Sequence, residues 1–417
     1  MILPDAVLLI GGGLLQTFIV SEILALGFTP LVTDRDPHAP AFKLAGVHPF
    51  VLDTYDVEEH RILVRDLQKM YTLCGVVTCG ADVAPTVSAA AEEAHLLGLP
   101  FAVAKETHNK LAVRTRLYAA GLERYQPRWC TETLSGLQAS HPFPWRHWGD
   151  DIVVKPLEQR ASRGVSIVPA GSVKVFAAIE KALTYGDPHV LIEERLYGTE
   201  HSAEMLLDPR NQEPLWFNIV DRKFTYANGL SIETGHVNPT SLSVAEQQAI
   251  KHMLLEAAAA LGVSWGPWKI DVMMTPEGPK ILEVTARLSG GFDAQVTSPL
   301  TKRFPLRMLL QQACGLAVDA QTAPRGFAAC AAVLPQKPGR VPTFRTDALW
   351  CQNLGVGQSL ERVIWAANPG TMVHPASHNG ERIGYVFAKA KTGALAWEHA
   401  LAAATSLAAS IEGERVC

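Results

Sequence analysis

Residues 269–287 read KIDVMMTPEGPKILEVTAR, and this stretch indicates more about the fold than any other. Pro276-Glu277-Gly278 suits a three-residue turn, because proline fixes the first turn position and glycine accepts the left-handed one. Thr275 would then pair with Pro279, and Asp271 would pair with Glu283. The sequence therefore predicts a β-hairpin that opposes two carboxylates.

Alternation along these two predicted strands places one set of polar side chains on the same face. The set is Lys269, Asp271, Glu283, Thr285 and Arg287. Directly opposed side chains lie about 5 Å apart at Cβ, so the carboxylates would repel each other without a cation between them. Mg²⁺ prefers such hard oxygen ligands. In the alternative interpretation, both carboxylates are paired with Lys269 and Arg287 on a solvated face.

A second polar segment, Glu158–Gly164, follows the predicted strand Ile152–Lys155. A lysine at a strand end, followed by a small loop with two arginines, can hold phosphates through charge and backbone N–H groups. The loop lacks the GxxxxGK[ST] pattern of a P-loop. An ordinary exposed hairpin is the alternative interpretation.

A third segment, residues 190–200, reads VLIEERLYGTE and places three carboxylates after an apolar run. These carboxylates could belong to a surface stretch. Because they follow a predicted buried strand, a role at the edge of a bound adenosine is the other interpretation. Both interpretations stay open on the residues of this segment alone.

The first hundred residues alternate predicted strands and helices, which is typical of a parallel, doubly wound sheet. Strand Ala6–Ile10 leads into Gly11-x-Gly13-x-x-Gln16, so the third glycine of a dinucleotide-binding fingerprint is missing. We expect a structural turn, or a wall of another substrate site, rather than an NAD site.

Composition excludes several classes of protein. Hydrophobic residues make up 48% of the 417 residues, and the formal net charge is −4, so neither disorder nor a nucleic-acid-binding surface is expected. We find no run of 18 apolar residues and no basic region before the first apolar run, so we expect neither a membrane span nor a signal peptide. Seven scattered cysteines favour a reducing cytoplasm.

These segments, in this order, resemble the ATP-grasp superfamily and look most like its carboxylate–amine ligases, the branch that contains the L-amino-acid (dipeptide) ligases. The resemblance implies an α/β protein with the ATP-grasp fold. It predicts an N-terminal Rossmann-like domain with a doubly wound parallel sheet over residues 1–105. The ATP-grasp domain would cover 106–318 in two subdomains, with a lid at about 150–195. A C-terminal α+β cap would cover 319–417.

The same resemblance assigns nucleotide contacts to eight positions: Lys110, Lys155, Ser162, Gly164, Glu193, Glu194, Leu196 and Glu200. Lys110 and Lys155 would contact the phosphates of ATP, and Lys155 also lies near the adenine. Ser162, Arg163 and Gly164 would form the lid over the phosphates. Glu193, Glu194 and Leu196 would hold the adenine, and Glu200 would bind the ribose.

The remaining assignments concern the metal, catalysis and the substrates. Asp271 and Glu283 match the magnesium carboxylates, while Thr285 stands where the E-x-N-x-R pattern has asparagine and is the third candidate ligand. Arg287 would steady an acyl phosphate. Arg287 and Arg163 are thus the candidate catalytic residues. The candidate substrate-binding residues are His236, Gly290 and Gly291.

The resemblance predicts an ATP-dependent ligase that forms an amide or peptide bond through an acyl phosphate. Its cofactors would be ATP and Mg²⁺, with Mn²⁺ as an alternative ion. Its partners would be a small-molecule carboxylate and an amine, with amino acids expected and a homodimer as the candidate assembly. The alternatives are a carboxylase or formate-using purine-type enzyme of the same fold, a nucleotide-binding protein without ligase activity, and, weakest, an NAD-dependent oxidoreductase.

Overall fold

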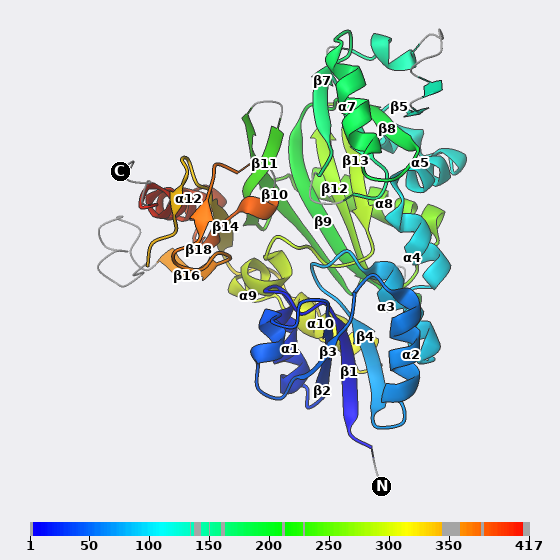
Figure 1. Cartoon of the computed structure of the whole chain (residues 1–417), viewed down its shortest axis with the longest axis vertical. Helices are drawn as coiled ribbons and strands as arrows, with labels where there is room; N and C mark the ends of the chain where they lie inside the picture. The colour runs from blue at the N-terminus through cyan, green and yellow to red at the C-terminus, as the bar shows by residue number, and fades with distance from the viewer. Residues whose placement is uncertain are drawn as a thin grey trace.

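A computed structural model describes residues 3–133, 135–136, 143–149, 151–159, 163–210, 213–227, 230–343, 359–376 and 379–411. Ser162 and Arg160 of the predicted lid lie outside these residues. Figure 1 shows the N-terminal sheet at one end of the molecule, a small sheet at the other end, and the C-terminal strands to one side.

The N-terminal sheet is parallel, with strand order β3-β2-β1-β4. Its elements are β1 (Asp5–Ile10), α1 (Gln16–Ala25), β2 (Thr29–Asp34), β3 (His48–Val51), α2 (Val57–Leu67), β4 (Thr72–Val77) and α3 (Ala84–Glu93). Apolar side chains of α1 pack on one face of the sheet and those of α2 and α3 on the other, which explains the continuous apolar run of Ala6–Ile10 in the central strand β1. The predicted doubly wound sheet is confirmed.

A small antiparallel sheet follows, with strand order β5-β8-β6-β7. Its elements are β5 (Trp129–Thr133), β6 (Asp151–Pro156), β7 (Ser166–Pro169), α7 (Lys174–Leu183) and β8 (His189–Glu194). Helices α4 (Phe101–His108) and α5 (Lys110–Ala119) precede it. The apolar face of α7 covers one side of the sheet, so the other side is left to face the rest of the molecule.

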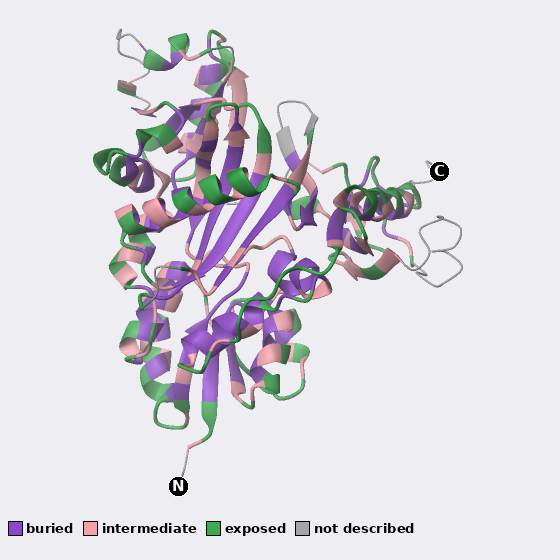
Figure 2. Cartoon of the chain, turned by 180° about the vertical axis from the view of Figure 1, so that it is seen from behind, coloured by how far each residue is buried: buried purple, intermediate pink, exposed green. Residues whose placement is uncertain are grey.

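The large sheet has eight strands in the order β13-β12-β9-β10-β11-β14-β18-β16, and neighbouring strands are antiparallel. They are β9 (Thr199–Leu207), β10 (Trp216–Ala227), β11 (Leu230–Asn238), β12 (Gly266–Thr275), β13 (Gly278–Thr285), β14 (Phe327–Val333), β16 (Leu360–Trp365) and β18 (Gly384–Ala390). The C-terminal strands therefore continue the same sheet as the central ones. Figure 2 shows the central strands as the most continuously buried part of the chain.

Helices pack on the large sheet and between it and the N-terminal sheet. These helices are α8 (Val244–Leu261), α9 (Ser298–Leu300), α10 (Pro305–Ala313) and α12 (Gly393–Ala409). A capping box of Ser243 and Glu246 begins α8, whose buried residues pack on β9, β12 and β13. Two short strands, β15 (Gly339–Arg340) and β17 (Met372–Val373), pair with each other.

The hairpin of β12 and β13 has the predicted opposition of Asp271 and Glu283, but its turn differs from the prediction. Thr275 pairs with Gly278, not with Pro279, so the loop has two residues instead of three. A β-bulge after Asp271 takes up the extra residue, Leu282, and restores the predicted pairing. The expectation of a three-residue turn was wrong because the bulge shifts the register near the turn.

Candidate active site

A cavity of about 530 Å³ lies between the two antiparallel sheets and is closed by loops of the N-terminal and C-terminal parts of the chain. Twelve of the residues that the sequence analysis assigns to the site line this cavity: Lys110, Lys155, Glu193, Glu194, Leu196, Glu200, His236, Asp271, Glu283, Arg287, Gly290 and Gly291. Segments that are far apart in sequence thus meet where the resemblance expects them to meet.

Two lysines enter the cavity from different elements and are held by carboxylates. Lys155, on β6, lies 2.5 Å from Oε2 of Glu193, and the other oxygen of this carboxylate accepts a 2.7 Å hydrogen bond from Nε of Arg114. Burial alone would raise the pKa of Glu193, but these two cations outweigh it and lower the pKa. Glu193 is therefore ionised, and its side chain positions Lys155. Lys110, the first residue of α5, donates to the Gln159 carbonyl at 2.6 Å.

The segment between β8 and β9 forms one wall of the cavity. Glu194 accepts hydrogen bonds from the backbone and side chain of Arg128, at 2.8 and 2.6 Å, so its carboxylate is tied to the residue before β5. Leu196 lies in the same wall. Glu200, on β9, lines the cavity from the large sheet. Burial raises the pKa of its carboxyl group, and the positive charge of Arg222 opposes this effect.

The two opposed carboxylates are paired with lysines. Asp271 lies 2.6 Å from Lys269, as the alternative interpretation expected, while Glu283 lies 3.0 Å from Lys110. Neither residue is on a solvated face, because the exposed fractions of the Asp271 and Glu283 side chains are 11% and 29% and both line the cavity. The alternative interpretation is therefore correct about one ion pair and wrong about the setting.

This pair of carboxylates fits Mg²⁺ only if phosphates complete the coordination. Among the described residues, no group of three or more histidines, cysteines, aspartates or glutamates is arranged to hold a metal ion. Mg²⁺ is often bound by one or two carboxylates together with substrate phosphates, rather than by a cage of protein ligands. The buried hydroxyl of Thr285 has no hydrogen-bond partner among the described residues, but Thr285 does not line the cavity, so its role as a third metal ligand stays a prediction.

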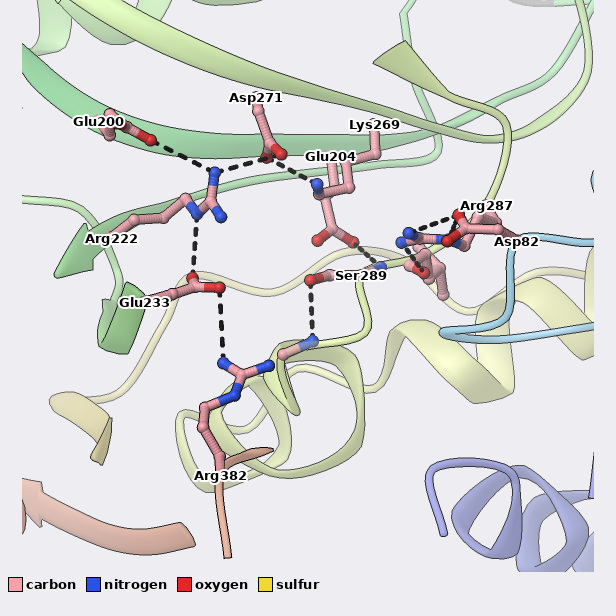
Figure 3. Close-up of polar contacts among 12 residues, drawn as sticks. Asp82, Glu200, Glu204, Arg222, Glu233, Lys269, Asp271, Arg287, Ser289 and Arg382 are labelled. Carbon is pink, nitrogen blue, oxygen red and sulfur yellow. Dashed lines mark hydrogen bonds and ion pairs between the residues drawn. The ribbon is translucent and has the colours of Figure 1, made fainter. Parts of the chain in front are cut away.

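Arg222, on β10, is the centre of a half-buried ion network that lines the cavity (Figure 3). Its guanidinium lies 3.0 Å from Glu233, 3.2 Å from Asp271 and 3.5 Å from Glu200. Arg382, which precedes β18, approaches Glu233 from the other side at 3.7 Å. Burial would raise the pKa of Glu233, but the two arginines outweigh it and lower the pKa to about 2.

Arg287 connects the large sheet to the N-terminal domain. Its Nε and Nη2 lie 2.9 and 2.7 Å from the same oxygen of Asp82, a residue of the loop after β4. Burial favours the neutral form of Arg287, but Asp82 outweighs burial and raises its pKa. The alternative interpretation had paired Arg287 with Asp271 or Glu283, and this expectation was wrong.

The expected substrate-binding residues lie at the end of the cavity near this arginine. Buried His236 contacts Thr297 through its Nε2, 2.9 Å from the hydroxyl, and burial lowers the pKa of the imidazole. A Cβ atom added to Gly290 would lie 3.3 Å from the carbonyl oxygen of Gly80. Gly290 therefore lies close to the backbone of the loop after β4, and a side chain at this position would require a small shift of one of the two loops.

Beneath this end of the cavity lies a buried carboxyl group, that of Glu204 on β9. One oxygen accepts a 3.1 Å hydrogen bond from the Ser289 backbone, and the other has no hydrogen-bond partner among the described residues. Burial, reinforced by Asp293, raises the pKa of Glu204 to about 8. Glu204 therefore holds its proton at neutral pH.

Several expected site residues lie elsewhere. Arg163 is exposed, and neither Arg163 nor Gly164 lines the cavity. Gly164 has a positive φ of 74°, and its Cβ position is filled by the Tyr185 ring, so its role here is in packing. Thr285 also lies outside the cavity lining. Ser162 is not described.

The glycine turn after β1 is a structural turn in this molecule. The Gly12 N–H donates to the carboxylate of Asp34 at 2.7 Å, and the Gln16 side chain donates to the Cys79 carbonyl. The groups that a dinucleotide would need are therefore engaged within the protein, which argues against the oxidoreductase alternative.

Sequence reasoning missed the residues that hold the expected ones in place: Asp82, Arg114, Arg222, Glu204, Glu233 and Arg382. One signal was available for Arg114, because it lies four residues after Lys110 and therefore on the same face of α5. The others carry no local pattern, and only the folded chain brings them to the cavity.

Two further expectations concern the whole chain. The five cysteines in the described part of the chain, Cys74, Cys79, Cys130, Cys314 and Cys330, are free. Within the same part, no helix is both long and apolar enough to cross a membrane.

Comparison with known proteins identifies the central region. Residues 149–295 match the ATP-grasp domain family. The chain is 32% identical over 139 residues to a D-alanine–D-alanine ligase of Aromatoleum aromaticum, a match covering 33% of this chain and 43% of that protein. It is 28% identical over 171 residues to a phosphoribosylamine–glycine ligase of Methanocorpusculum labreanum, covering 38% and 39%. The chain thus spans less than half the length of these two relatives.

The fold resembles solved structures over nearly the whole chain. The structure of an L-amino acid ligase from Bacillus licheniformis covers 96% of this chain and 97% of its own, with a TM-score of 0.77 and 21% sequence identity. The predicted ATP-grasp fold is therefore confirmed, and the chain contains an ATP-grasp domain, as the sequence resemblance implied.

Proposed function

We propose that this chain, which contains an ATP-grasp domain, is an ATP-dependent carboxylate–amine ligase with an amino acid among its substrates. The observation that carries the proposal is the convergence of Lys110, Lys155, Arg287 and the Asp271–Glu283 pair on one cavity. Cations from three elements opposite paired carboxylates suit a triphosphate and a second anionic reactant. The relatives named as ligases of amino acids or glycine support the choice of substrate class.

The reaction would proceed in two displacements. A substrate carboxylate oxygen attacks the γ-phosphorus of ATP, the bond to the bridging oxygen breaks, and ADP leaves. An amine then attacks the acyl carbon, the carbon–oxygen bond to phosphate breaks, and phosphate leaves as the nitrogen loses a proton. Mg²⁺ held by Asp271 and Glu283 would neutralise phosphate charge when bound.

The residues of the chain would mainly position the reactants and neutralise charge. Lys110 and Lys155 would hold the phosphates, and Glu193 keeps Lys155 in place. Arg287, fixed by Asp82, would face the acyl phosphate. Apolar residues of both sheets line the same cavity and would cover the adenine: Val153, Ile167, Met273 and Leu282.

The test is MgATP-dependent phosphate release with amino acids offered singly and in pairs, beside bicarbonate and formate. Release that requires one or two amino acids is the expected result, and release that requires bicarbonate or formate would favour the carboxylase or purine-type alternative. Absence of release with every compound would favour a binding protein without ligase activity.

Lys155→Ala tests the nucleotide site by a separate binding measurement. Loss of one charge-assisted phosphate contact should weaken ATP binding about 10- to 150-fold. Lys174→Ala is the matched control, because Lys174 is exposed at the start of α7. Calorimetry with MgATP reports the affinities, and thermal unfolding checks that both variants fold. Equal affinity in Lys155→Ala and wild type would contradict the assignment.

A further inference from the structure

We infer that Arg382 binds a carboxylate of the substrate other than the one that is activated. The inference rests on the proposed function and adds a substrate class to it. The ligand would be either an acid substrate with a second, acidic group or an amine substrate that keeps a free carboxylate.

Arg382 and Asn379 are the residues that the C-terminal part of the described chain contributes to the cavity. Asn379 accepts a 2.9 Å hydrogen bond from the Glu233 backbone through its side chain. Its carbonyl accepts a 2.7 Å hydrogen bond from Nε of Arg382. The C-terminal segment is thus bonded to the wall of the cavity at β11, and Arg382 reaches into the cavity from there, as Figure 3 shows.

The guanidinium of Arg382 is held on the side away from Glu233. Its Nε is bonded to Asn379, and its Cζ lies 5.4 Å from the centre of the Tyr385 ring. That ring in turn packs against Phe292, with 4.6 Å between the ring centres. A planar cation fixed in this way loses little freedom on binding a planar anion, which is the geometry that arginine offers to carboxylates.

Arg222, not Arg382, is the nearer partner of Glu233. Arg222 lies 3.0 Å from Glu233, within hydrogen-bond distance, whereas Nη1 of Arg382 lies 3.7 Å away, beyond it. The guanidinium of Arg382 therefore makes no hydrogen bond to Glu233 and can offer its N–H groups to a ligand anion.

Arg382 stays accessible from the cavity. His236 faces the same end, and burial lowers its pKa, so the imidazole is neutral at pH 7 and neither adds nor removes charge. The Arg382 side chain keeps 13% of its surface exposed in the cavity lining. An anion bound there would lie between Arg382 and the loop of Gly290 and Gly291, which also lines this end.

The experiment compares binding of two pairs of compounds that differ in one carboxylate, in the presence of Mg²⁺ and a non-hydrolysable ATP analogue. L-glutamate and L-glutamine test an acidic group on the acid substrate. L-alanine and L-alaninamide test a free carboxylate on the amine substrate. Calorimetry is made with wild type, Arg382→Gln, Arg382→Lys and the control Arg340→Gln, whose arginine is exposed in β15 outside the cavity.

We expect wild type to prefer the carboxylate member of one pair, and the pair identifies the source of the anion. Arg382→Gln should weaken that member about 10- to 150-fold while leaving its uncharged partner unchanged. Arg382→Lys should keep part of the preference, and Arg340→Gln should keep all of it.

Three outcomes would overturn the inference: no preference in wild type, an equal loss for both members of a pair in Arg382→Gln, or no binding of the four compounds by a wild type that binds the nucleotide analogue. Failure of the proposed function would appear differently, as absence of nucleotide binding and of phosphate release in the wild type. Thermal unfolding without ligand checks that Arg382→Gln folds, and Arg382→Lys provides the test if it does not.

Discussion

Glu204 is a buried carboxyl group whose protonation should make the stability of the chain depend on pH. Asp293, Lys269 and Arg287 act on it electrostatically, and burial with Asp293 raises its pKa to about 8. An unfolded glutamate has an ordinary pKa near 4.5. The folded chain therefore keeps a proton that the unfolded chain releases. The contribution of this protonated group to the stability of the folded chain is fully present below about pH 4.5 and is lost as the pH rises through about 8.

We predict that the melting temperature of wild type falls between pH 5 and pH 9 and that Glu204→Gln falls less. Glutamine has nearly the same shape and cannot release a proton, and one shifted group changes the free energy of unfolding by at most about 1.4 kcal/mol per pH unit. Thermal unfolding across this pH range measures the difference. Glu180→Gln, on the exposed surface of α7, is the control and should follow wild type. Parallel curves for wild type and Glu204→Gln would show that Glu204 ionises in the folded state at its ordinary pKa.

The hairpin of β12 and β13 shows what a sequence pattern can predict about an element. The turn residues and the alternation of polar positions correctly oppose Asp271 and Glu283. The bulge at Leu282 could not be predicted, because Ile281 and Leu282 are both apolar and the pattern does not say which one faces α8. In the structure Ile281 is fully buried and Leu282 lines the cavity.

Thr285 provides a test of the metal site on this hairpin. Asn at this position would place an amide oxygen at nearly the same reach as the hydroxyl, and an amide oxygen is a better ligand for Mg²⁺. We predict that Thr285→Asn keeps or raises the ligase rate and lowers the Mg²⁺ concentration that gives half the maximal rate. A titration of phosphate release with Mg²⁺ measures both quantities.

Glu283→Ala should abolish turnover, because no neighbouring oxygen can replace a carboxylate that would hold the metal against the phosphates. Glu277→Ala is the matched control, since Glu277 is an exposed carboxylate in the turn of the same hairpin. Full activity of Glu283→Ala would mean that the metal site lies elsewhere.

The architecture of the whole molecule was predicted better than the contacts between its parts. The alternation of strands and helices and the three polar segments are local patterns. They predict the doubly wound sheet and part of the cavity lining, including Lys155, Glu193 and Asp271. The network around Arg222 and the contact of Arg287 with Asp82 join residues up to 205 positions apart. Such pairings depend on how the sheets pack against each other, which no local pattern specifies.

Asp82 and Arg287 link the loop after β4 to the loop at the end of the cavity, so this ion pair ties a residue of the proposed active site to the N-terminal sheet. We predict that Asp82→Asn lowers the turnover number at least tenfold, which is about the size expected for one displaced positioning contact. The affinity for MgATP should stay within about a factor of two of the wild-type value. Asparagine keeps the shape but removes the charge that holds the guanidinium, and Lys110 and Lys155 are untouched by the change. Steady-state phosphate release and calorimetry measure the two effects, with Asp66→Asn, an exposed residue of α2 paired with Lys69, as the control. A loss of nucleotide affinity equal to the loss of turnover would instead mean that Asp82 supports the fold of the whole cavity and does not position Arg287 alone.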